Sequence, residues 1–149
     1  MIRILALFIG VLLVSGFDAP NLSPGEVVQM WTQLYAKDTA QAALLTTGRF
    51  RQWQEPERWA EKRRVKIMKV RFQHLGGEIA KTRISEKGAT IFFNARVKTA
   101  LGVITRLEVY DLRRIGGRWL IDAVRVTDEV RPREASALAC VVRNTPRFI

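Results

Sequence analysis

The sequence predicts a small α+β domain in which N-terminal helices pack against an antiparallel sheet of about four strands. Two features of the residue pattern lead to this prediction. Apolar residues recur at helical spacing over residues 24–75, whereas residues 78–127 alternate between apolar and polar side chains and are interrupted by glycine turns. The length of 149 residues, with 48% hydrophobic residues and four tryptophans, suits one domain with its own core.

Residues 1–16 have the layout of a secretory signal peptide: a basic residue near the start, an apolar run over residues 4–14, and small residues at the end. We expect cleavage after Gly16, with cleavage after Ala19 as the alternative. The apolar run is shorter than the roughly 20 residues that a transmembrane helix needs. The sequence therefore predicts an exported protein, periplasmic or secreted, with an uncleaved inner-membrane anchor as the second interpretation.

The first helix of the domain is expected to begin at Ser23-Pro24-Gly25-Glu26. Ser23 can cap the helix, Pro24 suits the first helical position, and Glu26 completes a capping box. An apolar stripe follows at helical spacing and predicts one buried helix face. Its members are Val27, Met30, Trp31, Leu34 and Tyr35.

A short second helix is expected after Lys37-Asp38, which breaks the first one. Asp38 can cap this second helix, and Thr46-Thr47-Gly48 ends it. Two aromatic residues in the loop that follows, Phe50 and Trp53, are expected to fill the gap between this turn and the sheet.

A third helix is expected to open at Pro56, to run to about Leu75, and to stop at Gly76-Gly77. This placement puts the only histidine, His74, at the end of the helix, where it caps or packs. Four apolar residues at helical spacing are expected to face the core. They are Val65, Met68, Phe72 and Leu75.

The densest positive stretch of the chain runs from Arg49 to Arg71, with nine Lys or Arg against three Glu. Within it, a basic stripe separate from the apolar one consists of Arg58, Lys62, Lys66 and Lys69. One interpretation is a solvated helix face, and the other is a contact surface for anionic lipid or an acidic protein. The net charge of +11 agrees with anionic partners in general, but export argues against nucleic acid as one of them.

Four strands are expected to follow, and the first is Glu78–Ser85, which a glycine turn joins to the second. The second strand, Ala89–Lys98, alternates, so its odd-numbered apolar residues share one face. The third strand, Val103–Ile115, has apolar residues on both faces, which is typical of a curved central strand. In the fourth strand, from Trp119 onward, the apolar phase slips by one residue near Ala123, which predicts a β-bulge.

Residues 131–149 form a basic tail with a short apolar segment, Ala135–Val142. Three arrangements are open for the tail: crossing the sheet, exchanging with a neighbouring chain, or remaining loose. The segment holds the only cysteine, Cys140, so the chain can form neither an internal disulfide nor a cysteine zinc site. We expect Cys140 to pack as a small apolar residue, with pairing between chains as the alternative.

Two motifs carry a family resemblance. The first is Ser23-Pro24-Gly25-Glu26-Val27-Val28 with Trp31 and Lys37-Asp38, and the second is Ala89-Thr90-Ile91 with Leu112 and Gly117-Arg118-Trp119-Leu120-Ile121-Asp122. Their order and spacing resemble the NTF2-like (cystatin-like) superfamily, in particular its small exported bacterial domains of unknown function of the DUF4878 type. The likeness covers residues 23–130, whereas the tail has no counterpart and the lipid-anchoring cysteine of many relatives is missing.

The resemblance implies a cone, in which a strongly bent sheet wraps around a long helix, with a pocket at the wide end and frequent homodimers. Enzymes of this superfamily work by acid–base chemistry from an Asp, His or Tyr inside the cone. Here Asp111 and Asp122 could equally pair across the sheet with Arg113, Arg114 or Arg125. The other candidates, Glu108 and Tyr110, do not cluster with His74 in a recognisable spacing. The sequence therefore assigns no catalytic, cofactor-binding or metal residue.

The expected role is a non-enzymatic binding or accessory module of the bacterial cell envelope. A small apolar or amphipathic ligand would occupy the cone. The candidate lining residues, which would serve equally well as core, are Trp31, Tyr35, Phe93 and Tyr110. The alternative is an interaction or scaffold domain of a secretion or conjugation assembly, and a small isomerase- or dehydratase-like enzyme is the third interpretation.

Overall fold

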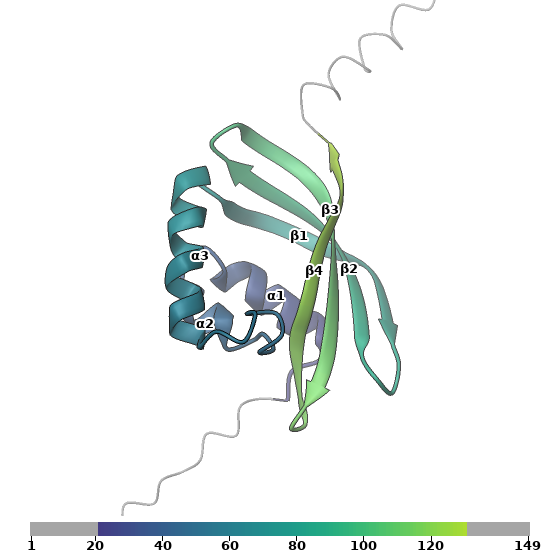
Figure 1. The fold of residues 1–149 in the computed structure, drawn as a ribbon. Helices are drawn as coiled ribbons and strands as arrows, with labels where there is room; N and C mark the ends of the chain where they lie inside the picture. The colour runs from purple at the N-terminus through teal and green to yellow at the C-terminus, as the bar shows by residue number, and fades with distance from the viewer. Residues whose placement is uncertain (1–20, 131–149) are drawn as a thin grey trace, which may run out of the picture.

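The computed structural model describes residues 21–130, which fold into three helices followed by four strands (Figure 1). The helices are α1 (Pro24–Leu34), α2 (Thr39–Ala43) and α3 (Pro56–Val70), and the strands are β1 (Gln73–Ile84), β2 (Ala89–Thr99), β3 (Gly102–Ile115) and β4 (Arg118–Val130). This order confirms the predicted α+β class. The expected signal segment and the tail with Cys140 lie outside the described residues. Within residues 21–130, no helix has the length and apolar character that crossing a membrane requires.

The strands form one antiparallel sheet in which each strand pairs with its neighbours in sequence, in the order β1-β2-β3-β4. The sheet is bent, and the helices lie on one side of it (Figure 1). The predicted face of β2 is confirmed, because its alternating apolar residues are at most 5% exposed. They are Ala89, Ile91, Phe93, Ala95 and Val97. α1 packs against this face through Val27, Val28 and Trp31.

Strand β4 contains two bulges that bend the sheet. The register between β3 and β4 skips Asp122, which is the bulge predicted near Ala123, and a second shift skips Thr127. The loop between α2 and α3 joins β4 at the first bulge. Thr46 forms a parallel bridge with Ile121, and the Thr47 hydroxyl donates to Asp122 Oδ1 at 2.8 Å.

The predicted starts of α1 and α2 are confirmed. The Ser23 hydroxyl accepts from the Glu26 backbone N–H (3.4 Å), and the Glu26 carboxylate accepts from the Ser23 N–H (2.8 Å), which completes the capping box. At α2, Asp38 Oδ1 accepts from the Gln41 N–H at 3.0 Å. These bonds satisfy N–H groups that a helix start otherwise leaves without partners.

The loop before α3 agrees with prediction at Phe50 and differs at Trp53. Phe50 is partly buried against both core clusters, but Trp53 is 82% exposed. Positive φ angles at Gln52 (54°) and Trp53 (60°) turn the backbone outward, so that the Trp53 indole lies against Gly48 instead of the sheet.

The predicted end of the third helix is wrong. α3 stops at Val70, Arg71 takes the left-handed conformation (φ 52°), and β1 begins at Gln73, earlier than predicted. Gly76-Gly77 therefore lie inside β1 and not in a helix stop. A Cβ atom on Gly77 would be 2.4 Å from the Asn94 carbonyl oxygen, so glycine here permits the close approach of β1 to β2.

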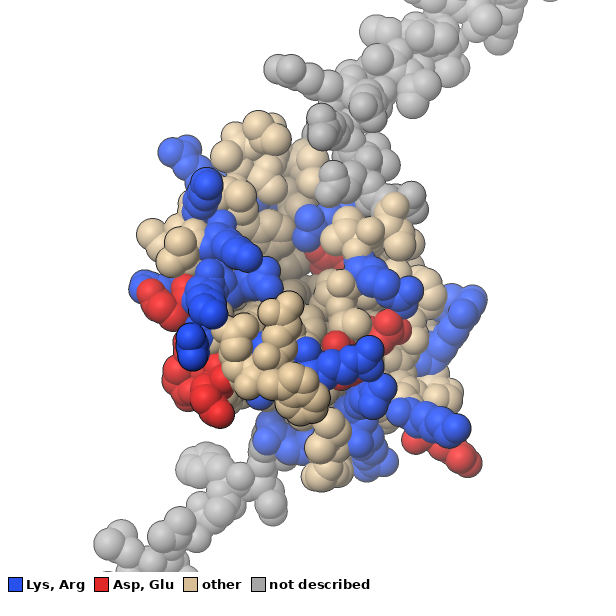
Figure 2. All heavy atoms as spheres, viewed as in Figure 1, with Lys and Arg blue, Asp and Glu red and all other residues tan. Residues whose placement is uncertain are grey.

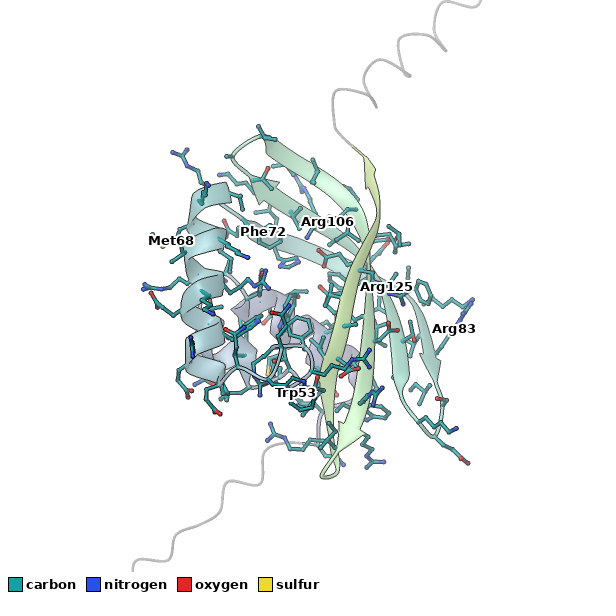
Figure 3. The ribbon with its side chains drawn as sticks, viewed as in Figure 1. Trp53, Met68, Phe72, Arg83, Arg106 and Arg125 are labelled. Atoms are coloured by element: carbon teal, nitrogen blue, oxygen red, sulfur yellow. The ribbon has the colours of Figure 1, made fainter. Side chains whose placement is uncertain are left out.

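The predicted inner face of the third helix is also wrong. Val65 and Met68 are 59% and 67% exposed, and Figure 3 shows Met68 on the side of α3 away from the sheet. Leu75 is exposed on β1, and only Phe72 of the predicted stripe packs against the core. The buried residues of α3 are Trp59, Ala60 and Ile67. Trp59 packs against the end of α2, and this contact sets the rotation of the helix.

Candidate ligand-binding cleft

A cleft of about 470 Å³ lies between α3 and the sheet. Figure 2 shows the molecule hollowed there, beside a row of Lys and Arg side chains on the α3 side. The volume falls within the roughly 300 to 1,000 Å³ of small-molecule sites. The lining residues are Trp31, Tyr35, Phe50, Trp59, Arg63, Lys66, Ile67, Val70, Phe72, His74, Arg106, Glu108, Val124 and Val126.

Aromatic rings make up much of the apolar lining. Trp31 and Tyr35 on α1 stack with their ring centroids 4.4 Å apart. Phe72 meets Tyr35 edge-on at 5.7 Å, and Phe50 lies 5.6 Å from Trp59. Each ring is held by another ring, so the apolar lining is formed before any ligand enters.

The lining also contains one buried carboxylate, Glu108 of β3, which is 1% exposed. The Tyr110 hydroxyl donates to it at 2.5 Å, Arg106 Nη2 donates at 2.6 Å, and His74 Nε2 lies 3.1 Å away. Arg106 in turn lies over the Phe72 ring, 5.1 Å from its centroid; both residues are labelled in Figure 3. A buried carboxylate is costly unless its oxygens are bonded, and here they are fully bonded.

These contacts determine the acid–base character of the site. Burial alone would raise the pKa of Glu108, but the hydrogen bonds with His74 and Tyr110 and the charge of Arg106 outweigh it and lower that pKa. Burial and the neighbouring Glu108 charge raise the pKa of Tyr110 well above its usual value. Near neutral pH, therefore, Glu108 is a weak base and Tyr110 a weak acid, which suits a structural network better than proton transfer.

Two buried polar atoms of the lining residues have no hydrogen-bond partner among the described residues: Trp31 Nε1 and His74 Nδ1. The Trp31 and His74 rings meet edge-on at 6.1 Å. The side chain of His74 is 3% exposed, and Trp31 is 4% exposed. A buried polar group without a partner costs about 1–3 kcal/mol, so such groups commonly bond water or a ligand.

Helix α3 contributes two cations to the cleft, Arg63 and Lys66. The Arg63 guanidinium lies over the Trp59 ring, 5.2 Å from its centroid. It is also close to Tyr35, whose pKa is raised by burial and in part lowered again by Arg63. Within the part of the chain that the structure describes, no carboxylate forms a salt bridge with Arg63 or Lys66.

Of the four aromatic residues that the sequence analysis proposed as lining of the ligand site, two line the cleft and two do not. Trp31 and Tyr35 line the cleft, whereas Phe93 and Tyr110, 2% and 0% exposed, belong to the core behind it. Of the two interpretations of Asp111 and Asp122, the structure shows pairing across the sheet: Asp111 binds Arg125 at 2.8 Å, and Asp122 binds Arg113 at 3.1 Å.

One expectation about the charged residues is corrected. His74 does not end a helix: it lies on β1 and pairs with Glu108, so an acid and the histidine do cluster. Alternation along β3 already puts Glu108 on the same face as Tyr110 and Leu112, but the histidine could not be placed while β1 was assigned to a helix. Among residues 21–130, no group of three or more His, Cys, Asp or Glu could hold a metal ion.

No protein-family model and no curated protein matches the chain. Among solved structures, a domain of unknown function with a cystatin-like fold from Nostoc punctiforme is similar, with a TM-score of 0.55 at 11% identity over 81% of this chain and 84% of that one. RPA3114, a SEC-C motif containing protein from Rhodopseudomonas palustris, has a TM-score of 0.54 at 19% identity, over 71% and 80% of the two chains.

A third similar structure is Bd1075 from Bdellovibrio bacteriovorus, with a TM-score of 0.53 at 10% identity over 67% of this chain. The match covers 37% of Bd1075, so this chain spans well under half of that protein. At such identities the likeness concerns the fold alone. The comparison agrees with the helix order and the bent four-stranded sheet described above: the chain has a cystatin-like (NTF2-like) fold.

Proposed function

We propose that this chain is a non-enzymatic binding module of the bacterial cell envelope, which holds a small apolar or amphipathic ligand between α3 and the sheet. The observation that supports this most directly is the aromatic cleft of about 470 Å³; two of its lining residues, Trp31 and His74, each have a buried ring nitrogen without a partner among the described residues. A preformed apolar cavity with a few polar groups is typical of small-molecule sites.

The Glu108 network supports binding over catalysis. A general base needs a free lone pair directed at the substrate and a pKa near the working pH. The oxygens of Glu108 are occupied by Arg106, Tyr110 and His74, and its pKa is lowered.

The envelope location is part of the proposal and rests on the sequence of residues 1–16, together with the resemblance to exported domains of the DUF4878 type. Expression of the full chain in a Gram-negative host, followed by fractionation and intact-mass measurement, tests it. We expect a periplasmic protein that begins at Phe17. A cytoplasmic protein of full mass would contradict export.

Native mass spectrometry of the same periplasmic protein, purified without denaturant, tests the binding function. We expect an adduct of small-molecule mass that disappears on denaturation. Val124→Trp, which fills the cleft, should remove the adduct, whereas Leu101→Trp in an exposed turn (94%) should keep it. An adduct that persists in Val124→Trp would contradict the proposal. So would a wild-type protein that shows no adduct and also fails to bind an added apolar dye.

A second candidate function is docking on an anionic membrane surface through the outer side of α3, as a scaffold domain of a secretion or conjugation assembly would. Val65 and Met68 are exposed on the same helix as the exposed Lys62 and Lys69. Apolar residues beside cations suit the interface of an anionic bilayer. Wild-type protein should co-sediment with phosphatidylglycerol vesicles in low salt, and Lys62→Glu/Lys69→Glu should not; equal sedimentation of the two proteins would exclude this surface.

A further inference from the structure

We infer that the ligand of the cleft is an amphipathic anion, with its anionic head group at Arg63 and Lys66 and its apolar body against the aromatic lining. A fatty acid is the simplest molecule of this class. The inference rests on the proposed function, that the cleft binds a ligand, and adds the chemical class of that ligand.

The rotation of α3 is the first observation behind it. A helix that covers a sheet normally turns its apolar stripe inward and its charges outward. Here Val65 and Met68 are 59% and 67% exposed, whereas Arg63 and Lys66 line the cleft. Positions where a sequence breaks such a local rule are often functional sites. Arg63 is half-buried and Lys66 is exposed where it borders the cleft, and no carboxylate among the described residues forms a salt bridge with either of them.

The charges of the lining are the second observation. The carboxylate of Glu108 already binds Arg106 at 2.6 Å, so these two charges compensate each other. The positive charges of Arg63 and Lys66 then remain without a carboxylate among the described residues. Beside a partly apolar cleft, such charges attract an anion more strongly than they would in bulk water.

The same geometry orients the ligand. The Glu108 carboxylate already occupies Arg106, Tyr110 and His74, so its part of the cleft offers an anionic head no free cation. The head therefore lies on the α3 side, where Arg63 is held over the Trp59 ring at 5.2 Å. The apolar body then follows the lining toward Phe72 and Val124.

Calorimetric titration of the full chain with decanoate and with decanol tests the inference, because the two probes differ only in the head group. We expect decanoate to bind about ten-fold or more tightly than decanol, since a charge-assisted hydrogen bond is stronger than a neutral one. Arg63→Gln/Lys66→Gln should weaken decanoate by about the same factor and leave decanol unchanged. Arg63→Lys/Lys66→Arg should keep decanoate binding.

A matched control has the same charge change on the same helix: Arg58→Gln/Arg64→Gln, at two exposed positions outside the cleft lining. It should leave both affinities unchanged. If the control lost as much decanoate affinity as Arg63→Gln/Lys66→Gln does, surface charge in general would attract the anion, and the inference would be overturned.

The remaining outcomes separate the inference from the proposed function. If decanoate and decanol bind equally and Arg63→Gln/Lys66→Gln changes neither, the ligand class is wrong while binding in the cleft stands. If neither probe binds and the native protein also carries no adduct, the proposed function fails and the inference with it. Circular dichroism of each variant establishes that it is folded before titration.

Discussion

At the scale of single residues, Glu108 is a charged side chain that the described part of the fold buries almost completely. It is 1% exposed, and its contacts come from a second strand as well as its own: His74 on β1, and Arg106 and Tyr110 on β3. An ionised group in such a position is tolerated because these contacts replace water. The network therefore links two strands that are not adjacent in the sheet.

Glu108→Gln should lower the free energy of unfolding by about 2 to 4 kcal/mol, since it leaves the partly buried Arg106 without its negative partner. Urea denaturation at neutral pH measures the effect. Asp111→Asn is the matched control on the same strand, because the Asp111–Arg125 pair is largely exposed and should contribute less than about 1 kcal/mol. Equal effects of the two changes would contradict the assigned importance of the buried network.

The same residue predicts a dependence of stability on pH. The pKa of Glu108 is lower in the folded protein than the value of about 4.3 for an unfolded glutamate. Its contribution is therefore fully present above that value and is lost as the pH falls through the folded pKa. The difference in unfolding free energy between wild type and Glu108→Gln should stay constant above about pH 5 and shrink below about pH 4. Urea curves measured across this range test the sign; a difference that grows on acidification would refute it.

At the scale of elements, the α3–β1 connection contains residues with a helical sequence pattern that form a strand in the structure. A continuous helical pattern up to Leu75 is present in the sequence, but the helix stops at Val70. The Ala100 N–H donates to the Val70 carbonyl at 2.8 Å, which ties the helix end to the β2–β3 turn. From Gln73 onward the chain forms backbone hydrogen bonds with β2 instead of continuing the helix.

Gly77→Ala should destabilise the protein by about 1–3 kcal/mol, because its Cβ would overlap the Asn94 carbonyl oxygen and the Phe93 ring. Thermal unfolding monitored by circular dichroism measures the loss. Gly25→Ala is the control: its Cβ would meet only the flexible end of Ile79 at 2.9 Å, and alanine favours the helix. If Gly77→Ala were as stable as wild type, the close approach of β1 to β2 would be wrong.

At the scale of the whole molecule, the two longer helices are held very differently. α1 packs against β1, β2 and β4, whereas α3 packs mainly against α2. α3 also starts without a side-chain cap, and a 15-residue helix on its own is marginally stable. The sheet and α1 therefore form a well-packed wall of the cleft, whereas the opposite wall, α3, is held by few tertiary contacts.

Hydrogen–deuterium exchange should therefore be faster in α3 than in α1 and β2. Saturating decanoate, if it binds at Arg63 and Lys66, should slow exchange over Trp59–Val70 and leave the β1–β2 turn at Glu86, which lies outside the cleft lining, unchanged. Decanol serves as the control ligand. Exchange in α3 as slow as in β2 without ligand would contradict this description of the helix.

The sequence by itself determined what short-range chemistry controls. The capping box at Ser23, the Asp38 cap, the alternation of β2 and the bulge next to Ala123 were all predicted, because each depends on residues a few positions apart. The α+β order follows from the same signals, whereas the cystatin-like fold was expected only from the family resemblance.

Only the tertiary structure decided the rotation of α3, the exposure of Trp53 and the site itself. The packing of Trp59 against α2 turns Arg63 inward and Met68 outward, although the local pattern favours the reverse. His74 and Glu108 are 34 residues apart and meet only because β1 and β3 both flank β2. Helical spacing describes neighbours along one element, whereas a cleft depends on which elements pack together, and that choice is made by contacts distant in sequence.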